Sequence, residues 1–397
     1  MPGDVDSGHL IPYRVARDPS VALRRVCDVH QAFDLNRFYD AINPYSVGQH
    51  ESQFLSIGIR RRCVTQESAD GIEIGSIRKF DAGEAVIGVE FLDTTAAFIL
   101  AEENVVFVQI EGGERKLRLH DGAILCSAMD GERLLTGGDD GRVVATDQVG
   151  VSEVFFADAK RRWVDRLAAM HGGNIAWSIG KQVSYQVLGE PEQVIQVPSS
   201  VGGLAFARDA SKLAVSHYGG VTLIERGSKH PLSVLDWKGS HMDVMFSPDG
   251  EILVTTMREP TLHVWRLTDK QNLPTPGYPA RVRSLDWTAS GRFLATAGSD
   301  RLTLLTFRSE DNPLARMPLL LAPYRRLVSV VACHPTKEIA AVAYEDGLVL
   351  LVRIPDGAEI MVKTPDENII SAMRWNKVGT QLGIASENGY CRILSMK

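Results

Sequence analysis

The sequence predicts an all-β fold, a β-propeller in which repeated sheets stand side by side around a ring. From about residue 84 onward, a unit of short apolar strands and polar turns recurs along the chain. Its apolar anchors are spaced about 40 residues apart, the length of one propeller blade. The turns within the units are rich in Asp-Gly, Asn-Gly and Gly-Gly, which supply the positive φ that tight hairpins need.

The clearest copy of the unit runs from Gly239 to Leu267. It predicts strands over 242–246, 252–256 and 262–267, with the turn Ser-Pro-Asp-Gly at 247–250 between the first two. Each strand is short and rich in β-branched or aromatic residues, which favours strands over helices.

Seven further copies align with this one, and the recurring anchors are Phe206, Phe246, Trp287, Cys333 and Trp375. These copies span residues 86–110, 123–146, 164–187, 201–224, 282–307, 328–354 and 370–394. The copies at 86–110 and 164–187 match least well. We therefore predict eight blades, with seven as the alternative.

A ring explains the repeats because each small sheet has two apolar faces and buries them only against its neighbours. A linear array or a sandwich is the alternative for alternating strands, and the constant period near 40 residues favours the ring over both. The chain ends in the strand-like segment 391–394, so the last blade lacks an outer strand. We predict that Ser76 to Phe80 supplies it and closes the ring.

Residues 1–75 do not match the repeat and are predicted to form an irregular N-terminal extension before the propeller at 76–397. A short helix is predicted over 21–39, and Arg60–Arg62 is a small basic cluster. Partial disorder of this extension is expected from its scattered charges. An over-extended start codon is the alternative.

The composition is that of an ordinary globular protein, with 397 residues, 44% hydrophobic, 23% charged and a formal net charge of −6. This charge opposes general nucleic-acid binding, which needs a basic footprint. Neither a signal peptide nor an apolar run long enough to span a membrane is found. The cysteines are odd in number and far apart, which indicates a reducing, cytoplasmic setting; they are Cys27, Cys63, Cys126, Cys333 and Cys391.

The repeats resemble WD40 repeats over about four-fifths of the chain. The resemblance rests on Ser240-His241 before the first strand of the clearest copy, the turn at 247–250, and Val264-Trp265 near the end of its third strand. The resemblance implies a scaffold whose partners dock on the top face of the propeller or at the mouth of its central channel. It also implies a buried hydrogen-bond network of His, Asp, Ser or Thr, and Trp in each blade.

The chain departs from the WD40 pattern in several places. No Trp-Asp dipeptide occurs, since Trp265 is followed by Arg266, and most units lack the His. Only the blade with His241, Thr255 or Thr256, and Trp265 is expected to keep much of the network, without the turn Asp. These departures favour a divergent, bacterial member of the family.

Motifs for enzymatic chemistry are not found. The sequence has no G-x-S-x-G, no G-x-x-x-x-G-K-[ST] and no G-x-G-x-x-G. Cys27, His30, His50 and Cys63 are residue types that zinc accepts, but the second pair is irregularly spaced, so unrelated residues are the preferred interpretation. We expect no cofactor, no bound metal and no enzyme activity.

Basic and aromatic residues that precede the first strand of three units suggest a binding surface. The predicted partner-binding residues on the top face are Lys238, His241, Arg281, Arg283, Tyr324, Arg325 and Arg326. Arg and Tyr are favoured anchors in interfaces, and ordinary solvated charges are the alternative.

The first hypothesis is a monomeric, non-enzymatic scaffold that binds other proteins. The second is a propeller enzyme, a metal-dependent hydrolase or lyase with ligands gathered at the channel mouth. The third is a peripheral membrane adaptor that uses Arg60–Arg62.

Overall fold

The computed structural model describes residues 72–226, 231–273, 275, 277–307 and 317–397. Several predictions for the extension lie outside these residues: its partial disorder, the helix over 21–39, the basic cluster Arg60–Arg62 and the zinc-type residues Cys27, His30, His50 and Cys63. Within them the chain is all β, with 30 strands and no helix. No described segment is therefore a helix that could cross a membrane.

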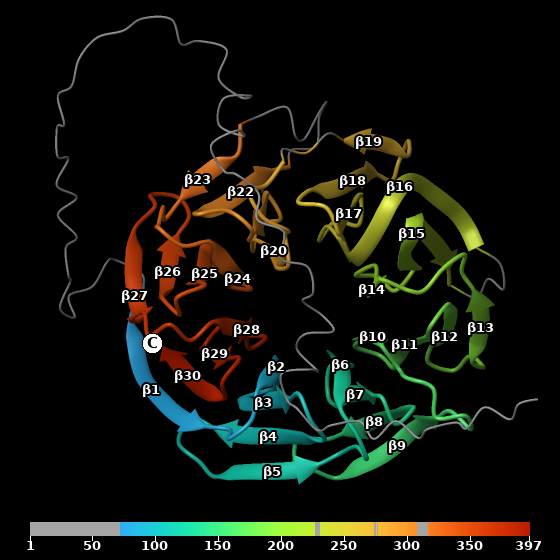
Figure 1. The fold of residues 1–397 in the computed structure, drawn as a ribbon, viewed down its shortest axis with the longest axis horizontal. Coiled ribbons are helices and arrows are strands. Elements are labelled where there is room, and N and C mark those ends of the chain that lie inside the picture. The colour runs from blue at the N-terminus through green and yellow to red at the C-terminus, as the bar shows by residue number, and fades with distance from the viewer. Residues whose placement is uncertain (1–71, 227–230, 274, 276, 308–316) are drawn as a thin grey trace, which may run out of the picture. The chain divides into compact units, whose positions relative to one another are not determined.

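The strands form seven hydrogen-bonded sheets around a ring, six of them four-stranded (Figure 1). The first sheet consists of β2 (Val86–Leu92), β3 (Thr95–Leu100), β4 (Asn104–Gln109) and β5 (Glu114–Arg118). The second consists of β6 (Ile124–Met129), β7 (Leu134–Gly138), β8 (Arg142–Thr146) and β9 (Ser152–Ala157). The third consists of β10 (Arg166–Met170), β11 (Asn174–Ile179), β12 (Gln182–Gln186) and β13 (Gln193–Gln196). Three four-stranded sheets come later in the chain. One consists of β20 (Leu285–Trp287), β21 (Phe293–Thr296), β22 (Leu302–Thr306) and β23 (Leu319–Leu321), and the next of β24 (Val328–Cys333), β25 (Ile339–Tyr344), β26 (Val349–Arg353) and β27 (Glu359–Lys363). The last consists of β28 (Ile370–Trp375), β29 (Gln381–Ser386), β30 (Tyr390–Met396) and β1 (Ile74–Asp81).

The seventh sheet has six strands and holds two of the sequence repeats, and we call it the double blade. Its strands are β14 (Gly203–Phe206), β15 (Lys212–Glu225), β16 (Pro231–Phe246), β17 (Ile252–Met257), β18 (Leu262–Arg266) and β19 (Gln271–Leu273). The propeller thus has seven blades, which is the alternative count. The primary prediction of eight separate blades is not matched, although all eight repeats are present.

Two long strands explain the merger. The backbone of β15 doubles back, because Arg226 N–H donates to Ser211 O at 3.0 Å and Gly219 and Gly220 adopt positive φ between them. The next strand, β16, runs unbroken for 16 residues from the outer edge of one repeat to the inner edge of the next (Figure 1). Its first half pairs with β15 and its second half pairs with β17, so both repeats share one sheet.

The ring closes as the sequence predicts. Strand β1 pairs antiparallel with β30, with Phe80 opposite Cys391, and so becomes the outer strand of the last blade. In Figure 1 these two ends of the described chain lie side by side. The strand begins at Ile74, two residues before the predicted segment.

The core lies between blades, as expected for a propeller. Each apolar cluster draws buried residues from neighbouring repeats. The cluster at the closure joins Phe98 and Leu100 of the first blade to Ile393 of the last, all fully buried. Packing of this kind stabilises the ring because no single sheet has a core of its own.

Candidate functional site

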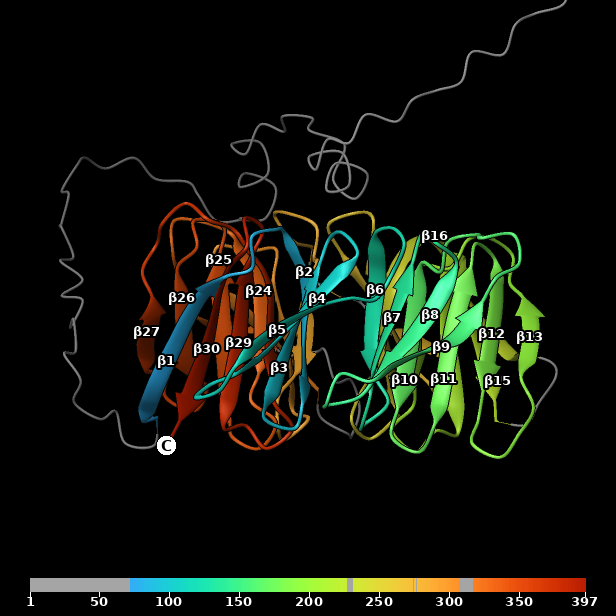
Figure 2. The same cartoon turned by 90° about the horizontal axis from the view of Figure 1, so that it is seen from below.

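One end of the strands carries two kinds of connection, and we call this end the loop face. It holds the links from the outer strand of one repeat to the inner strand of the next, and the turns between the second and third strands. Hydrogen bonds join the two kinds, as when Glu345 N–H donates to Leu327 O and Glu387 N–H donates to Ile369 O, both at 3.0 Å. Figure 2 shows the ring from the side, with its turns and connections at two opposite ends of the strands.

All seven residues predicted to bind a partner lie in links of the loop face, but the structure does not bring them into one cluster. Lys238, Arg283, Arg325 and Arg326 are exposed, and Arg281 is half-buried. Arg326 forms an ion pair with Glu367 at 3.6 Å. Arg325 lies over the ring of Tyr324, 5.8 Å from its centroid.

Two of the predicted residues serve the blades themselves. His241 is only 1% exposed, and its ring nitrogens hydrogen-bond Thr255 Oγ1 at 2.8 Å and Trp237 O at 3.0 Å. The hydroxyl of Tyr324 donates to Asp346 Oδ2 at 2.8 Å. Their polar groups are thus used inside the fold.

Fragments of the family hydrogen-bond network occur in more blades than the sequence suggests. In the blade of β6–β9, His120 Nε2 hydrogen-bonds Thr136 Oγ1 at 2.9 Å and His120 Nδ1 hydrogen-bonds Asp140 Oδ1 at 3.0 Å. The expectation that only the blade with His241 keeps much of the network is therefore wrong. The sequence does carry a signal for this network, in His120, Thr136 and the turn residue Asp140. Only the Trp of the WD40 pattern is missing from this blade.

The network also tolerates replacement of its histidine. Tyr278 takes that place in the blade of β20–β23, where its hydroxyl hydrogen-bonds Thr296 Oγ1 at 3.0 Å. In the first repeat of the double blade, His217 bonds Thr222 Oγ1 at 2.9 Å. The Tyr278–Thr296 bond ties a link to its blade, whereas the His217–Thr222 bond joins two residues within β15.

Three large aromatic side chains are exposed on the loop face of neighbouring repeats, and none of them is among the residues predicted from the sequence to bind a partner. Trp163 is 51% exposed, Tyr218 59% and Trp237 43%. Exposed cations, including Arg161 and Lys238, stand beside them in the chain. We call this set the aromatic sector.

The aromatic sector is held rigidly at the double blade. The indole of Trp237 stacks on the ring of His263, with centroids 4.0 Å apart. Tyr218 lies opposite Ser240 in the sheet, and its backbone N–H donates to Ser199 Oγ at 2.8 Å. The exposed rings are therefore presented by ordered backbone, which lowers the entropy cost of binding a partner.

Charged side chains also line the central channel. Arg374 of β28 makes two hydrogen bonds to Glu90 of β2, at 3.0 and 3.2 Å, across the closure of the ring. Burial raises the pKa of the Asp286 carboxyl on β20, and the charge of Arg374 partly offsets this. The Arg374–Glu90 pair joins the last repeat to the first, so it belongs to the closure of the ring.

Buried histidines beneath the aromatic sector have lowered pKa values. Burial lowers the pKa of His263 to about 4; the hydrogen bond to Asn272 partly opposes this shift, and the neighbouring His241 adds to it. Burial also lowers the pKa of His241, whose surroundings include His217 and Glu259. Both rings stay neutral at neutral pH, which suits their stacking with Trp237 and Trp265.

These histidines predict a pH dependence of stability. A pKa lowered from the usual value near 6.5 means that the unfolded chain binds protons more strongly, so the contribution to stability is complete above about pH 6.5 and is lost as the pH falls toward 4. For His263 this loss is up to about 3 kcal/mol. Urea unfolding from pH 7 to 4 should show a smaller decline in the free energy of unfolding for His263→Gln than for the unchanged protein. Equal slopes would contradict this.

Metal sites and disulfides give no further site within the described ranges. There, no group of three or more His, Cys, Asp or Glu side chains could hold a metal ion. Cys126, Cys333 and Cys391 are free thiols. Burial raises the pKa of Cys126 to about 12, so this thiol is protonated and unreactive at neutral pH.

Comparisons with known proteins agree with this geometry. A family model described as the WD domain, G-beta repeat, matches residues 270–304. A computationally designed protein, Ika8, has a similar structure, with a TM-score of 0.65, 16% sequence identity, and coverage of 82% of this chain and 100% of that chain. That likeness concerns the fold alone. The comparison with curated proteins gave no match.

The fold and these matches define the class of the protein as a β-propeller. The matched repeat covers β19 to β22, across the junction of the double blade and the next blade, and so includes one link of the loop face. The chain is thus a seven-bladed β-propeller that carries a match to one WD40 repeat, and WD40 propellers generally mediate protein–protein interaction.

Proposed function

We propose that this propeller is a non-enzymatic scaffold that binds a partner protein on the aromatic sector of its loop face. The observation that carries the proposal is the exposure of Trp163, Tyr218 and Trp237 on neighbouring repeats of one face. Large aromatic side chains dominate the energy of protein interfaces and are unfavourable when left in water. The predicted residue Lys238 lies next to this sector in the chain and belongs to the proposed surface.

Several properties expected from the sequence belong to the same proposal. The net charge of −6 supports a protein partner rather than a nucleic acid. The free thiols support a reducing, cytoplasmic setting. We also infer that the protein acts as a monomer.

The test is affinity capture of the tagged full chain from its own cells, followed by mass spectrometry. The double variant Tyr218→Ala/Lys238→Glu should lose at least about 10-fold of the captured partner, since a central aromatic anchor often contributes 1–2 kcal/mol or more. Its thermal unfolding should stay close to that of the unchanged protein because both side chains are exposed.

The matched control is Tyr390→Ala/Lys377→Glu. Tyr390 is 53% exposed on the last blade, far along the ring from the double blade, and Lys377 is exposed in a turn at the other end of the strands. Undiminished capture by the aromatic-sector variant, or equal loss with the control, would refute the proposed site.

A further inference from the structure

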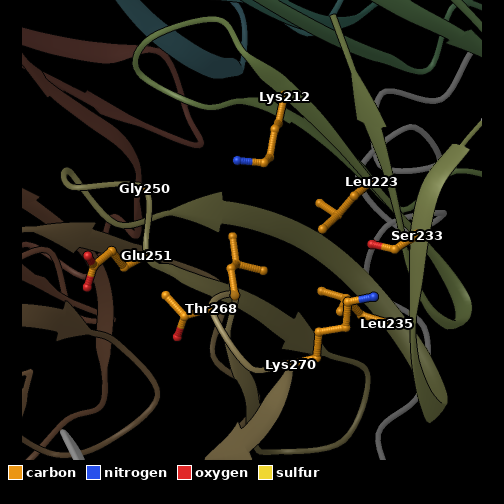
Figure 3. A pocket seen from close by; sticks show the side chains of 9 residues that line it. Lys212, Leu223, Ser233, Leu235, Gly250, Glu251, Thr268 and Lys270 are labelled. Carbon is orange, nitrogen blue, oxygen red and sulfur yellow. The ribbon is translucent and has the colours of Figure 1, made fainter. Parts of the chain in front are cut away.

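A groove opens at the end of the double blade opposite the loop face (Figure 3). It has a volume of about 460 Å³ and lies between the two repeats that share this sheet. One wall comes from Lys212 and from the strands that carry Leu223 and Ser233. The other comes from the turns around Gly250 and Thr268.

The floor of the groove is apolar. Leu223 and Leu235 are buried, and Leu267 packs against the same cluster while remaining partly exposed. The groove therefore forms where the core between two repeats opens to solvent. An apolar side chain placed there would remove this surface from water, which is favourable by about 25 cal/mol for each Å² buried.

Two lysines stand at the rim of the groove. Figure 3 shows Lys212 and Lys270 on opposite sides of the opening. Among the residues that the structure describes, neither ammonium forms a salt bridge. Two nearby carboxylates are paired with arginines instead, Asp269 with Arg266 at 2.7 Å and Glu190 with Arg226 at 3.4 Å.

The turn that carries Lys270 is built to hold it at the rim. Asp269 accepts hydrogen bonds from Arg266 and from the backbone N–H of Gln271, at 3.1 Å. Lys270 itself has a φ of 57°, a left-handed conformation that is uncommon for a residue other than glycine. The hydrogen bonds around Asp269 thus stabilise the unfavourable backbone conformation of Lys270, whose side chain lines the groove.

The remaining polar groups narrow the class of ligand. Ser233 and Thr268 add hydroxyl groups that can donate to an anion, whereas Glu251 places one carboxylate at the far end. The lining residues thus include two lysines and one carboxylate. This balance favours a ligand with a negatively charged group near the leucine floor. The groove is open along its rim, so it suits a side-chain pair of an extended peptide better than an enclosed small molecule.

We propose that this groove binds an acidic peptide segment of a partner protein, with a carboxylate between Lys212 and Lys270 and an adjacent apolar side chain on the leucine floor. This second site goes beyond the loop-face function and does not depend on it. It would allow the propeller to hold two protein segments at once, one at each end of its strands.

The test is fluorescence anisotropy with the full chain and a fluorescein-labelled hexapeptide of alternating Leu and Glu. We expect saturable binding that a matched peptide of Leu and Gln lacks. The double variant Lys212→Gln/Lys270→Gln should bind the acidic peptide at least about 10-fold more weakly, while Glu251→Gln should bind it about 2-fold to 5-fold more tightly.

The control is Lys181→Gln, which removes an exposed lysine on the loop face and should leave the affinity unchanged. Absence of saturable binding, equal binding of the Gln peptide, or an equal loss with Lys181→Gln would overturn the proposal. Loss of peptide binding in Tyr218→Ala/Lys238→Glu would also overturn it, because the probe would then occupy the loop face. Failed partner capture by that variant, with peptide binding kept, would support both sites.

Discussion

Deleting residues 2–83 should strongly destabilise the propeller, whereas deleting residues 2–71 should leave the ring intact. The longer deletion removes β1, which supplies the outer strand of the last blade and pairs with β30 from Ile74 to Asp81. It also removes the ring of Phe80, which packs edge-on against the fully buried Phe98 at 4.9 Å. The last blade would then expose an unpaired edge and part of the core at the closure.

The expected loss is large because the blades stabilise one another around the ring. An opened closure exposes apolar surface on both the first and the last blade, so we expect the free energy of unfolding to fall by at least about 4 kcal/mol. Urea unfolding followed by circular dichroism measures it. Phe80→Ala should show a smaller loss, about 1–3 kcal/mol, because the side chain is only half-buried. Equal stability of the two deletions would contradict closure by β1.

Gly220→Ala should destabilise the double blade more than any other single alanine substitution in its hairpin. Gly220 has a φ of 144°, and an added Cβ would lie only 2.0 Å from the backbone oxygen of Leu235 in the paired strand. The substitution therefore imposes a strained backbone and a steric clash together. We expect a loss of at least about 3 kcal/mol in the free energy of unfolding.

Two controls separate the causes of this loss. Gly219→Ala meets nothing within 4 Å but keeps a φ of 95°, so it should cost only the conformational part, about 1 kcal/mol. Gly113→Ala meets nothing within 4 Å and has no positive φ, so it should be close to neutral. A neutral Gly220→Ala would show that β15 does not double back at this point.

Much of the blade structure could be predicted from the sequence. The predicted strands 252–256 and 262–267 match β17 and β18 to within one residue, and Gly250 of the predicted turn 247–250 has a positive φ. These features are local, since apolar alternation and turn glycines act over a few residues. The closure was also predictable because the last repeat visibly lacked one strand.

The outer strands and the blade count could not be predicted in the same way. Outer strands such as β5, with the sequence ERKLR, are mostly exposed and carry no apolar pattern. Whether two repeats share a sheet depends on the backbone path of β16 across the loop face, which hydrophobic spacing does not encode. The count of eight repeats therefore exceeded the number of sheets.

The candidate site was predictable only in its location. The links that were chosen do lie on the loop face, but His241 and Tyr324 make hydrogen bonds inside their blades. Trp163 and Tyr218 are not among the predicted residues, because the sequence alone does not distinguish an exposed aromatic side chain from one in the core. Exposure distinguishes the two cases, and exposure depends on tertiary packing.

The most direct test of the account is hydrogen–deuterium exchange of the full chain, free and in complex with its captured partner. The account predicts slower exchange on binding in peptides that cover residues 160–164, 216–220 and 236–240, which together form the aromatic sector. Protection confined to the opposite end of the strands, for example at 249–251 and 267–271, would contradict docking on the loop face and would place the partner at the groove instead.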